Sequence, residues 1–459
     1  MKHAKIAVAV LLGSLLTTAP AFAAFEGLSM MRMGAWEVDF SGNVNAFVTD
    51  TECNSDANGA VGGGLACGSS PTDDGRDFHN IRTGLLPSWF NMSAATLTDE
   101  GIKTGIHISF QPGVDSNTAL SVGGNDGALG LNSANFRQVF LTFGNENMGT
   151  FKIGRDLGVY GSDAILNDMT LLGVGSGAGG SGGNTTLGRI GVGYLYADWK
   201  SQLQYTSPNI NGFTLTAALV DTWGTGSFAG AAGNNGTPDD TTDDIPHSAT
   251  GDQAGDNFGF EAKVNYAFDN GAGTSGLLWA SYIQQDVDFD QALSGRNADG
   301  RATMTSPAFA GDDGGDARGY DVGFKVAVHD FDLVGYYYDG EGIGTTSFLL
   351  DAFDPVGDER DADGYYVQAR YRMPMGTLLG VSVGESNLDE TTYDEARRAD
   401  GSNGGGTLVE TNESWIVGLY HPVGEALNLV IEYTDTESEA HNGNEADDET
   451  LAIGAIMFF

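Results

Sequence analysis

The chain has 459 residues, of which 62 are acidic and 21 are Lys or Arg, so its formal net charge is −41. This charge argues against a nucleic-acid-binding protein, because contact with a phosphate backbone requires a positively charged surface. The 69 glycines and 11 prolines argue against a helical bundle, and the glycines lack the three-residue period of collagen. Since 10% of the residues are aromatic, the chain is not disordered, and a turn-rich β protein with an acidic surface remains.

The first 23 residues have the three parts of a secretory signal peptide. Two lysines precede an apolar run over residues 6–16, and Ala21 and Ala23 occupy the −3 and −1 positions of a cleavage site. We expect cleavage after Ala23, which leaves residues 24–459 as a single domain. An uncleaved membrane anchor is the alternative, but the apolar run is too short to span a bilayer comfortably as a helix.

The chain has two cysteines, Cys53 and Cys67, in a segment rich in Gly, Asn, Asp and Ser. In an exported protein we expect them to form a disulfide. Two free thiols are the alternative. The spacing of the two cysteines fits no zinc-binding pattern, and no histidine lies close enough in the sequence to complete one.

Downstream of the signal peptide the sequence alternates between two kinds of side chain. In residues 320–328, Tyr320, Val322 and Phe324 share one face, whereas Asp321 and Lys325 share the other. Half-buried strands alternate in this way. A large apolar face opposite a polar face is also what a membrane barrel requires, since its outside meets lipid and its inside meets water.

The number and spacing of these segments favour a membrane barrel. Sixteen strands are expected, many of them close to the length that crosses a bilayer at a tilt: 35–48, 80–97, 102–112, 134–143, 149–156, 198–207, 213–222, 257–268, 276–285, 319–328, 331–339, 364–373, 377–386, 413–421, 427–436 and 449–459. The connections alternate between short turns and long loops, as in bacterial outer-membrane barrels. The sequence therefore predicts an all-β, 16-stranded antiparallel transmembrane barrel, with outer-membrane lipid around it, short periplasmic turns and long extracellular loops.

The end of the chain agrees with this fold. Residues 451–459 alternate again and finish in a terminal phenylalanine, Phe459, which resembles the signal that barrel-assembly machinery reads. We expect this last strand to pair with the first strand, near Trp36, and so to close the barrel. Closure matters because lipid offers no hydrogen-bonding partner to an unpaired edge.

Several segments, in order, resemble the general (trimeric) porins of Gram-negative bacteria. They are Phe136–Gly144 with Gly149–Arg155, Leu187–Arg189, Ser201–Pro208 with Asn211–Phe213, Trp415–Tyr420, and Glu432 with Tyr433. The resemblance extends over essentially all of the mature chain. It implies a homotrimer in the outer membrane that lets small hydrophilic solutes and ions diffuse through a water-filled channel. It also implies that the third long loop, residues 157–197, folds inward and narrows the pore.

In this family, acids on the third loop face arginines on the wall. By position, Arg155 and Arg189 match the wall arginines, and Arg82 and Arg137 are further candidates. Asp163 and Asp168 are the only acids in the loop. These six residues are the predicted pore constriction. The chain departs from the family pattern at residues 171–175, which carry no charge where further acids are usual. Either the acidic side of the constriction is weak, or acids come from elsewhere on the wall.

Other chemistry has little support in the sequence. Residues 179–183 fit G-x-S-x-G only within a glycine run, and no nucleophile with a neighbouring base is evident, so no enzyme is predicted. The acidic stretch at residues 361–364 resembles half of a calcium loop but lacks its closing glutamate. No cofactor is predicted, and weak Ca²⁺ or Mg²⁺ binding by acidic loops stays open.

Three other functions remain as alternatives, namely a substrate-specific outer-membrane channel, a secreted acidic adhesin and a barrel enzyme. Within the channel reading, the distribution of charge predicts a preference for cations. The eight long loops together hold 41 acids and 8 basic residues, and the strands and short turns of the mature chain are much closer to neutral. The charge is thus concentrated at one end of the predicted barrel, where it would attract cations.

Overall fold

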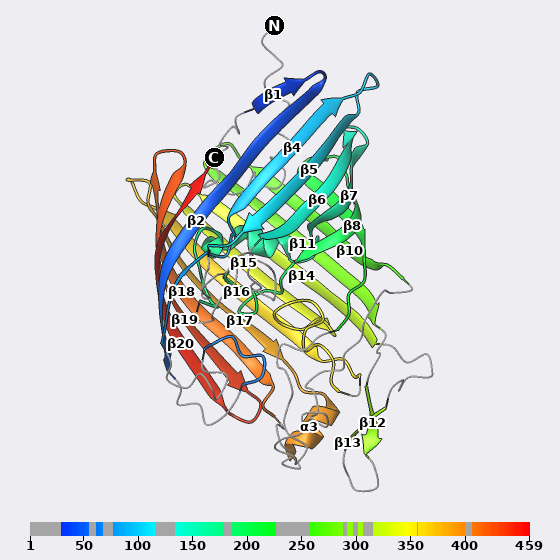
Figure 1. The fold of residues 1–459 in the computed structure, drawn as a ribbon, viewed down its shortest axis with the longest axis vertical. Coiled ribbons are helices and arrows are strands. Elements are labelled where there is room, and N and C mark those ends of the chain that lie inside the picture. The colour runs from blue at the N-terminus through cyan, green and yellow to red at the C-terminus, as the bar shows by residue number, and fades with distance from the viewer. Residues whose placement is uncertain are drawn as a thin grey trace.

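The computed structural model describes residues 29–54, 61–67, 77–114, 134–178, 185–225, 257–287, 292–296, 302–305, 315–355, 357–399 and 406–459. Most of these residues form long antiparallel strands arranged as a barrel (Figure 1). The wall strands are β2 (Trp36–Asn54), β3 (Phe78–Arg82), β4 (Trp89–Leu97), β5 (Lys103–Pro112), β6 (Ala134–Asn145), β7 (Gly149–Leu157), β8 (Trp199–Thr206), β9 (Phe213–Val220), β10 (Gly259–Asp269), β11 (Thr274–Val287), β14 (Gly315–Val328), β15 (Phe331–Glu341), β16 (Asp361–Arg372), β17 (Leu378–Leu388), β18 (Val409–Val423), β19 (Leu427–Ala440) and β20 (Glu445–Phe458).

The barrel closes between its last and first strands, as predicted. β20 pairs antiparallel with β2 from Asn43↔Phe458 to Asn54↔Asp447. At the very end, the backbone groups of Gly42 and Phe459 exchange two hydrogen bonds of 2.9 and 3.0 Å. Apart from β3 and β4, which both pair with β2, every other wall strand pairs with its neighbours in the chain, so the prediction of a closed 16-stranded antiparallel barrel is confirmed.

One predicted strand, residues 80–97, is divided into β3 and β4, which share a single position beside β2. β3 pairs with residues 47–51 of β2, and β4 pairs with residues 37–43. Between them, Gly84 N–H donates to the side chain of Asn45, and Leu85 N–H donates to the carbonyl of Gly173. The chain leaves the wall here because this segment binds the loop inside the barrel.

The remaining elements lie at the two ends of the barrel or within it. β1 (Ser29–Met33) forms a hairpin with β2 and pairs with residues 36–39 of β2, which β20 does not cover. β12 (Ala292–Arg296) and β13 (Ala302–Thr305) form a separate two-stranded sheet. The helices are α2 (Ser162–Asn167), the 3₁₀ helix η2 (Met169–Leu172) and α3 (Thr392–Ala399). In the described part of the chain, no helix has both the length and the apolar character needed to cross a membrane.

The period-two pattern of the sequence sets the two faces of the wall. On β14, Tyr320, Val322 and Phe324 are 48%, 46% and 37% exposed on the outside. Asp321 and Lys325 alternate with them and are buried inside. The apolar outer face suits lipid and the polar inner face suits water, as expected for a membrane barrel.

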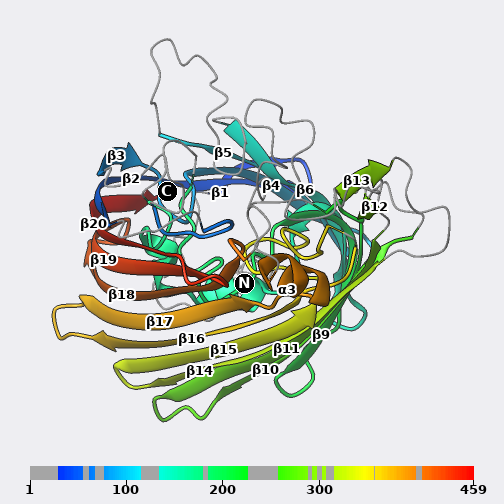
Figure 2. The ribbon, with the colours of Figure 1, turned by 90° about the horizontal axis from the view of Figure 1, so that it is seen from below.

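The connections differ between the two ends. One end has short turns, such as that between β4 and β5, and the other end carries the long loops (Figure 1). Figure 1 shows α3, β12 and β13 at the long-loop end, with β1 at the opposite end. Seen from the long-loop end in Figure 2, the strands form a ring, and α3 projects over the interior.

Candidate pore constriction

The connection between β7 and β8 folds into the barrel, and it is the predicted constriction loop. Its helices α2 and η2 are almost completely buried. Inward-facing side chains of four distant wall strands, β10, β14, β16 and β19, accept hydrogen bonds from its backbone N–H groups. The loop therefore crosses the lumen and is held on the opposite wall.

Two wall carboxylates hold the beginning of the loop. Glu261 on β10 accepts from the N–H groups of Val159 and Tyr160, at 2.5 and 2.9 Å. Asp321 on β14 accepts from the N–H of Gly161 at 3.1 Å. Gly161 has a φ of 69°, the left-handed conformation that glycine adopts without strain, and it directs the chain into α2.

β16 holds the middle of the loop. The side chain of Gln368 accepts from Met169 N–H at 2.7 Å and donates to the carbonyl of Asn167 at 3.1 Å. The Tyr366 hydroxyl donates to the carbonyl of Ala164 at 2.9 Å. Both wall side chains satisfy backbone groups near the ends of the short helices, where intrahelical partners are missing.

Glu432 on β19 holds the uncharged stretch at residues 171–175. Its Oε2 accepts from the N–H groups of Val174 and Gly175, at 2.5 and 3.1 Å, and its Oε1 accepts from the Tyr420 hydroxyl at 2.5 Å. A β-carbon on Gly173 would lie 2.1 Å from Glu432 Oε1, so a larger residue there would displace the carboxylate. The acid at this part of the loop thus comes from the wall, in a position that the sequence did not identify.

Arg189 lies on the returning part of the loop and is completely buried. It donates from Nε to Ser382 Oγ at 2.5 Å, from Nη1 to Val192 O at 3.0 Å and to Ser414 Oγ at 3.2 Å, and from Nη2 to Ser414 O at 3.3 Å. Burial lowers the pKa of Arg189 to about 10, an effect that the nearby Asp168 opposes. The guanidinium is therefore still charged at neutral pH, and it joins the loop to β17 and β18.

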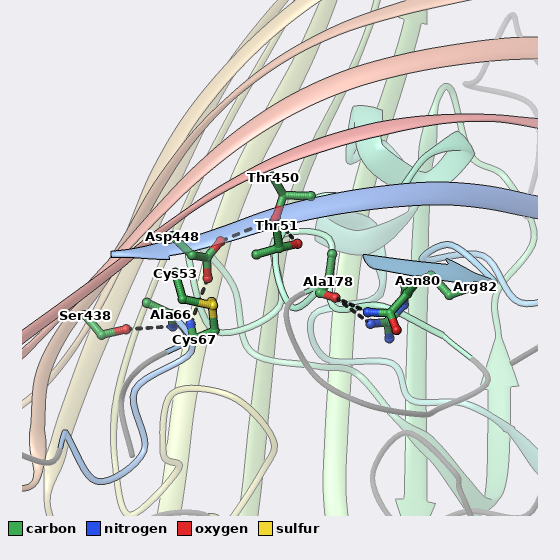
Figure 3. Close-up of a disulfide and its surroundings, with 10 residues drawn as sticks. All are labelled: Thr51, Cys53, Ala66, Cys67, Asn80, Arg82, Ala178, Ser438, Asp448 and Thr450. Carbon is green, nitrogen blue, oxygen red and sulfur yellow. Dashed lines mark hydrogen bonds between the residues drawn. A yellow bond between two sulfur atoms is a disulfide. The ribbon is translucent and has the colours of Figure 1, made fainter. Parts of the chain in front are cut away.

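Arg82 and Arg137 also face the loop, from the other side of the barrel. Arg82 donates to the carbonyl of Ala178 at 2.9 Å (Figure 3). It also donates to the carbonyl of Thr185 at 3.2 Å. The guanidinium carbon of Arg137 lies 5.9 Å from the ring centre of Trp199, and its Nη1 donates to the Tyr196 hydroxyl at 3.4 Å. Three of the four predicted arginines are thus brought together around the loop.

Arg155 differs, because its side chain lies on the outer face of β7. It is exposed, shares this face with Ile153, and is paired across the strands with Val139, which is 46% exposed. Lys152 and Asp156 form an ion pair on the inner face of the same strand. Side chains alternate along a strand, so Arg155 cannot share the lumen with these two. The arginine that matched the family by position is directed away from the pore.

The two predicted acids have different surroundings. Asp163 Oδ2 forms an ion pair of 2.8 Å with Lys263 Nζ on β10, and it accepts from the amide of Asn265 at 2.9 Å. Asp168 is 3% exposed and binds within the loop. Its Oδ1 caps η2 by accepting from Thr170 N–H, and its Oδ2 accepts from the Tyr194 hydroxyl at 2.9 Å. Asp163 joins the loop to the wall, whereas Asp168 holds the loop in shape.

A second segment also folds against the inner wall, and it carries the disulfide (Figure 3). Cys53 on β2 is bonded to Cys67. The N–H of Cys67 donates to Asp448 Oδ2 at 2.9 Å, and the N–H of Ala66 donates to Ser438 Oγ at 3.0 Å. The disulfide therefore ties residues 61–67 to the wall near β19 and β20. In the described residues, no group of three or more His, Cys, Asp or Glu side chains is placed to hold a metal ion.

Comparisons with known proteins agree with this geometry. A sequence model of the family described as Gram-negative porin matches residues 7–391. A search of curated proteins found no match. The outer membrane channel DcaP of Acinetobacter baumannii is similar in structure, with a TM-score of 0.58 and 14% identity over 94% of this chain and 99% of that chain.

Two further solved structures have the same fold. An anion-selective porin from Comamonas acidovorans has a TM-score of 0.54 and 13% identity, over 92% of this chain and 100% of that chain. Salmonella typhi OmpF, solved with daunomycin, has a TM-score of 0.52 and 13% identity, over 94% of this chain and 100% of that chain.

Proposed function

The chain belongs to the Gram-negative porin family and is an outer-membrane channel rather than an enzyme, and we propose that it passes small hydrophilic solutes and ions by diffusion, with a preference for cations. The observation that carries this proposal is the loop between β7 and β8, which crosses the lumen of a 16-stranded barrel. A barrel of this size is too wide for side chains to fill and encloses water. Whatever projects into it then determines which solutes pass.

The proposed constriction consists of the loop and the wall groups that hold it. Arg82, Arg137 and Arg189 supply positive charge around the loop, and Asp163 and Asp168 supply negative charge on it. Opposed charges of this kind create a field across the pore, which orients dipolar solutes and biases ion passage. Arg155 is left out of this set because it faces outward.

The cation preference is argued from the charge at the long-loop end. In the described part of the wall, carboxylates of this end point away from the lumen on the following residues: Glu52, Asp286, Asp316, Asp339, Glu341, Asp361, Asp363, Glu385, Glu413, Asp435, Glu437, Glu439, Glu445, Asp447 and Glu449. Glu437 lies directly across from Glu413, and Glu413 across from Glu385. Such a rim raises the local concentration of cations, and salt weakens the effect.

Ion preference is tested by the zero-current potential of single channels across a KCl gradient in a planar bilayer. A potential of the sign expected for potassium supports the proposal, and the chloride sign contradicts it. The fold alone does not decide this question, since one of the similar structures is an anion-selective porin. The charge of this chain carries the proposal instead.

A homotrimer is part of the proposal, and the outer face of β2, β4, β5 and β6 is its proposed interface. Successive aromatic rings lie next to one another there: Phe40–Phe90 at 6.1 Å, Phe90–Phe110 at 5.1 Å, Phe110–Phe136 at 6.2 Å and Phe90–Phe459 at 6.4 Å between ring centres. Among the described residues of β4 to β9, Arg155 is the one charged side chain on the outer face. An apolar surface without a charged rim suits contact with a second subunit.

Export by a cleaved signal peptide is also proposed. Residues 1–23 lie outside the described residues, so this proposal is supported by the sequence pattern alone. Mass spectrometry of the protein extracted from outer membranes tests it. A mature N-terminus at Ala24 supports cleavage after Ala23, and an intact Met1 contradicts it.

A further inference from the structure

A cavity of about 450 Å³ opens at the long-loop end, at the junction of three chain segments. Asp198 ends the loop that crosses the lumen, Thr222 to Gly224 follow β9, and Ser347, Phe348 and Leu350 belong to the connection between β15 and β16. The Tyr196 N–H donates to Thr346 O, which joins two of these segments beside the cavity. The volume is in the range that holds a small organic molecule.

One wall of the cavity carries the carboxylate of Asp198. Its Oδ1 accepts from the N–H of Trp199 at 2.7 Å, and its Oδ2 accepts from the Ser347 hydroxyl at 3.4 Å. The residue is partly buried and has a φ of 52°, an unusual conformation for a residue other than glycine. Burial raises the pKa of Asp198, which means that its neighbours compensate the loss of water only in part.

Lys200, two residues after Asp198 in the sequence, forms an ion pair with a different acid. Lys200 is 3% exposed and forms an ion pair with Glu261, which is completely buried. No described cation forms an ion pair with Asp198. Lys200, Arg137 and Arg155 act on Asp198 without forming an ion pair with it, so they offset its charge only in part. The carboxylate can therefore attract a positively charged group that enters the cavity.

Two aromatic residues also line the cavity. The rings of Trp223 and Phe348 both line it, and the Lys200 ammonium lies 5.2 and 4.9 Å from their centres. These two rings already contact one cation, which fits their negative π faces. Leu350 adds a further apolar side chain. The site thus combines one carboxylate with a flat apolar wall.

We propose that this cavity binds small organic cations that carry a protonated amine on an apolar or aromatic body. The amine lies against the Asp198 carboxylate, and the body lies against Trp223 and Phe348. This inference rests on the proposed function, because it names a class of solute that the channel collects at its outer mouth. A bare metal ion fits less well, since the cavity offers few oxygen ligands for Mg²⁺ or Ca²⁺. A sugar needs several hydrogen-bonding partners, and apolar groups form most of this lining.

Benzylammonium is a suitable probe, and benzyl alcohol is its neutral counterpart. We expect benzylammonium, added on the long-loop side of a planar bilayer, to block single channels, and benzyl alcohol not to. Asp198→Asn keeps the hydrogen-bond acceptor for Trp199 and the preferred backbone conformation but removes the charge. It should weaken the block by about tenfold or more, as expected for the loss of a charge-assisted hydrogen bond. Trp223→Ala should weaken it by about fivefold.

Asp221→Asn is the matched control, because Asp221 is an exposed acid next to the cavity segment but does not line the cavity. If only the general charge of the mouth matters, Asp221→Asn and Asp198→Asn will weaken the block equally, and the inference is overturned. Unchanged block in Asp198→Asn, or equal block by benzyl alcohol, overturns it as well.

Calorimetry of benzylammonium binding to the detergent-purified protein separates this inference from the proposed function. Binding that depends on Asp198 but not on Asp221 supports the site even if the zero-current potential shows no cation preference. If the channel prefers cations but binds no benzylammonium, the proposed function stands and the proposed binding site is wrong. Heat-modifiable migration on gels, equal to that of the unaltered protein, shows that each variant is folded.

Discussion

Asp163 Oδ2, on the loop that crosses the lumen, lies 2.8 Å from Lys263 Nζ on β10. Both side chains are mostly buried, with 11% and 14% of their surfaces exposed. This ion pair connects the loop to the wall at the proposed constriction. It also means that the lysine is neutralised by one of the acids that the sequence had assigned to the constriction.

Removing the acid should therefore leave an uncompensated positive charge in the pore. We predict that Asp163→Asn lowers the ratio of cation to anion permeability by about two- to fivefold, a change of ~0.4–1 kcal/mol. Zero-current potentials in a KCl gradient measure it. Glu146→Gln is the control, because Glu146 is an exposed acid in the short turn after β6 and lies outside the constriction loop. An equal change in both variants, or none in Asp163→Asn, would contradict the assignment.

Glu432 should determine how firmly the loop is held. We predict that Glu432→Gln destabilises the folded protein by about 1–3 kcal/mol, because the neutral amide replaces an acceptor shared by Val174, Gly175 and Tyr420. The unfolding temperature on heated gels should fall, and the open-channel current should become noisier. Glu439→Gln, on the exposed face of the same strand, should change neither quantity. A quiet, fully stable Glu432→Gln channel would show that the carboxylate does not hold the loop.

The disulfide should contribute stability through the unfolded chain. Cys53 and Cys67 are 14 residues apart, and a bridge across a loop of this length contributes about 3 kcal/mol. We expect reduction to lower the unfolding temperature without changing conductance. The double variant Cys53→Ser with Cys67→Ser should unfold at the lower temperature whether or not reductant is present. If the unfolding temperature of the wild-type protein does not change when reductant is added, this prediction is contradicted.

The proposed subunit interface can be tested with two phenylalanines of equal exposure. Phe90 belongs to the aromatic row on the outer face of β2 to β6, and Phe324 faces outward on β14; each is 37% exposed. We predict that Phe90→Ala weakens the trimer, measured as the fraction of trimer on unheated gels and by chemical cross-linking. Phe324→Ala should leave the trimer intact. The reverse result would move the interface to the other side of the barrel.

Alternation along the sequence was enough to predict the wall. Successive side chains of a strand point to opposite faces, so the face on which Tyr320 lies also determines the faces of Asp321 and Val322. The same rule places Arg155 outward, beside Ile153 and opposite in phase to Lys152 and Asp156. The prediction of a pore-facing Arg155 came from its position in the resembling family, and the local pattern was the better guide.

The contacts of the constriction could not be predicted in the same way. Val174 and Glu432 are 258 residues apart, and Arg189 and Ser414 are 225 apart. Glu432 and Asp448 are both acids on the inner face of a strand, so the sequence pattern does not distinguish them. Glu432 nevertheless binds the loop, whereas Asp448 binds Cys67. Strand register and the path of the loop decide which inward-facing acid contacts the loop. Neither of them produces a repeating pattern in the sequence from which it could be predicted.

The sequence by itself determined the class of fold, the number of strands, the side of each strand that faces lipid and the end of the barrel that carries the charge. These properties follow from local alternation and composition, because each strand must satisfy lipid on one face and water on the other. Only the tertiary structure decided that Glu261, Asp321 and Glu432 hold the loop and that Asp198 lines a cavity beside it. Such contacts depend on barrel closure, which brings distant inner faces within hydrogen-bonding distance of one buried loop.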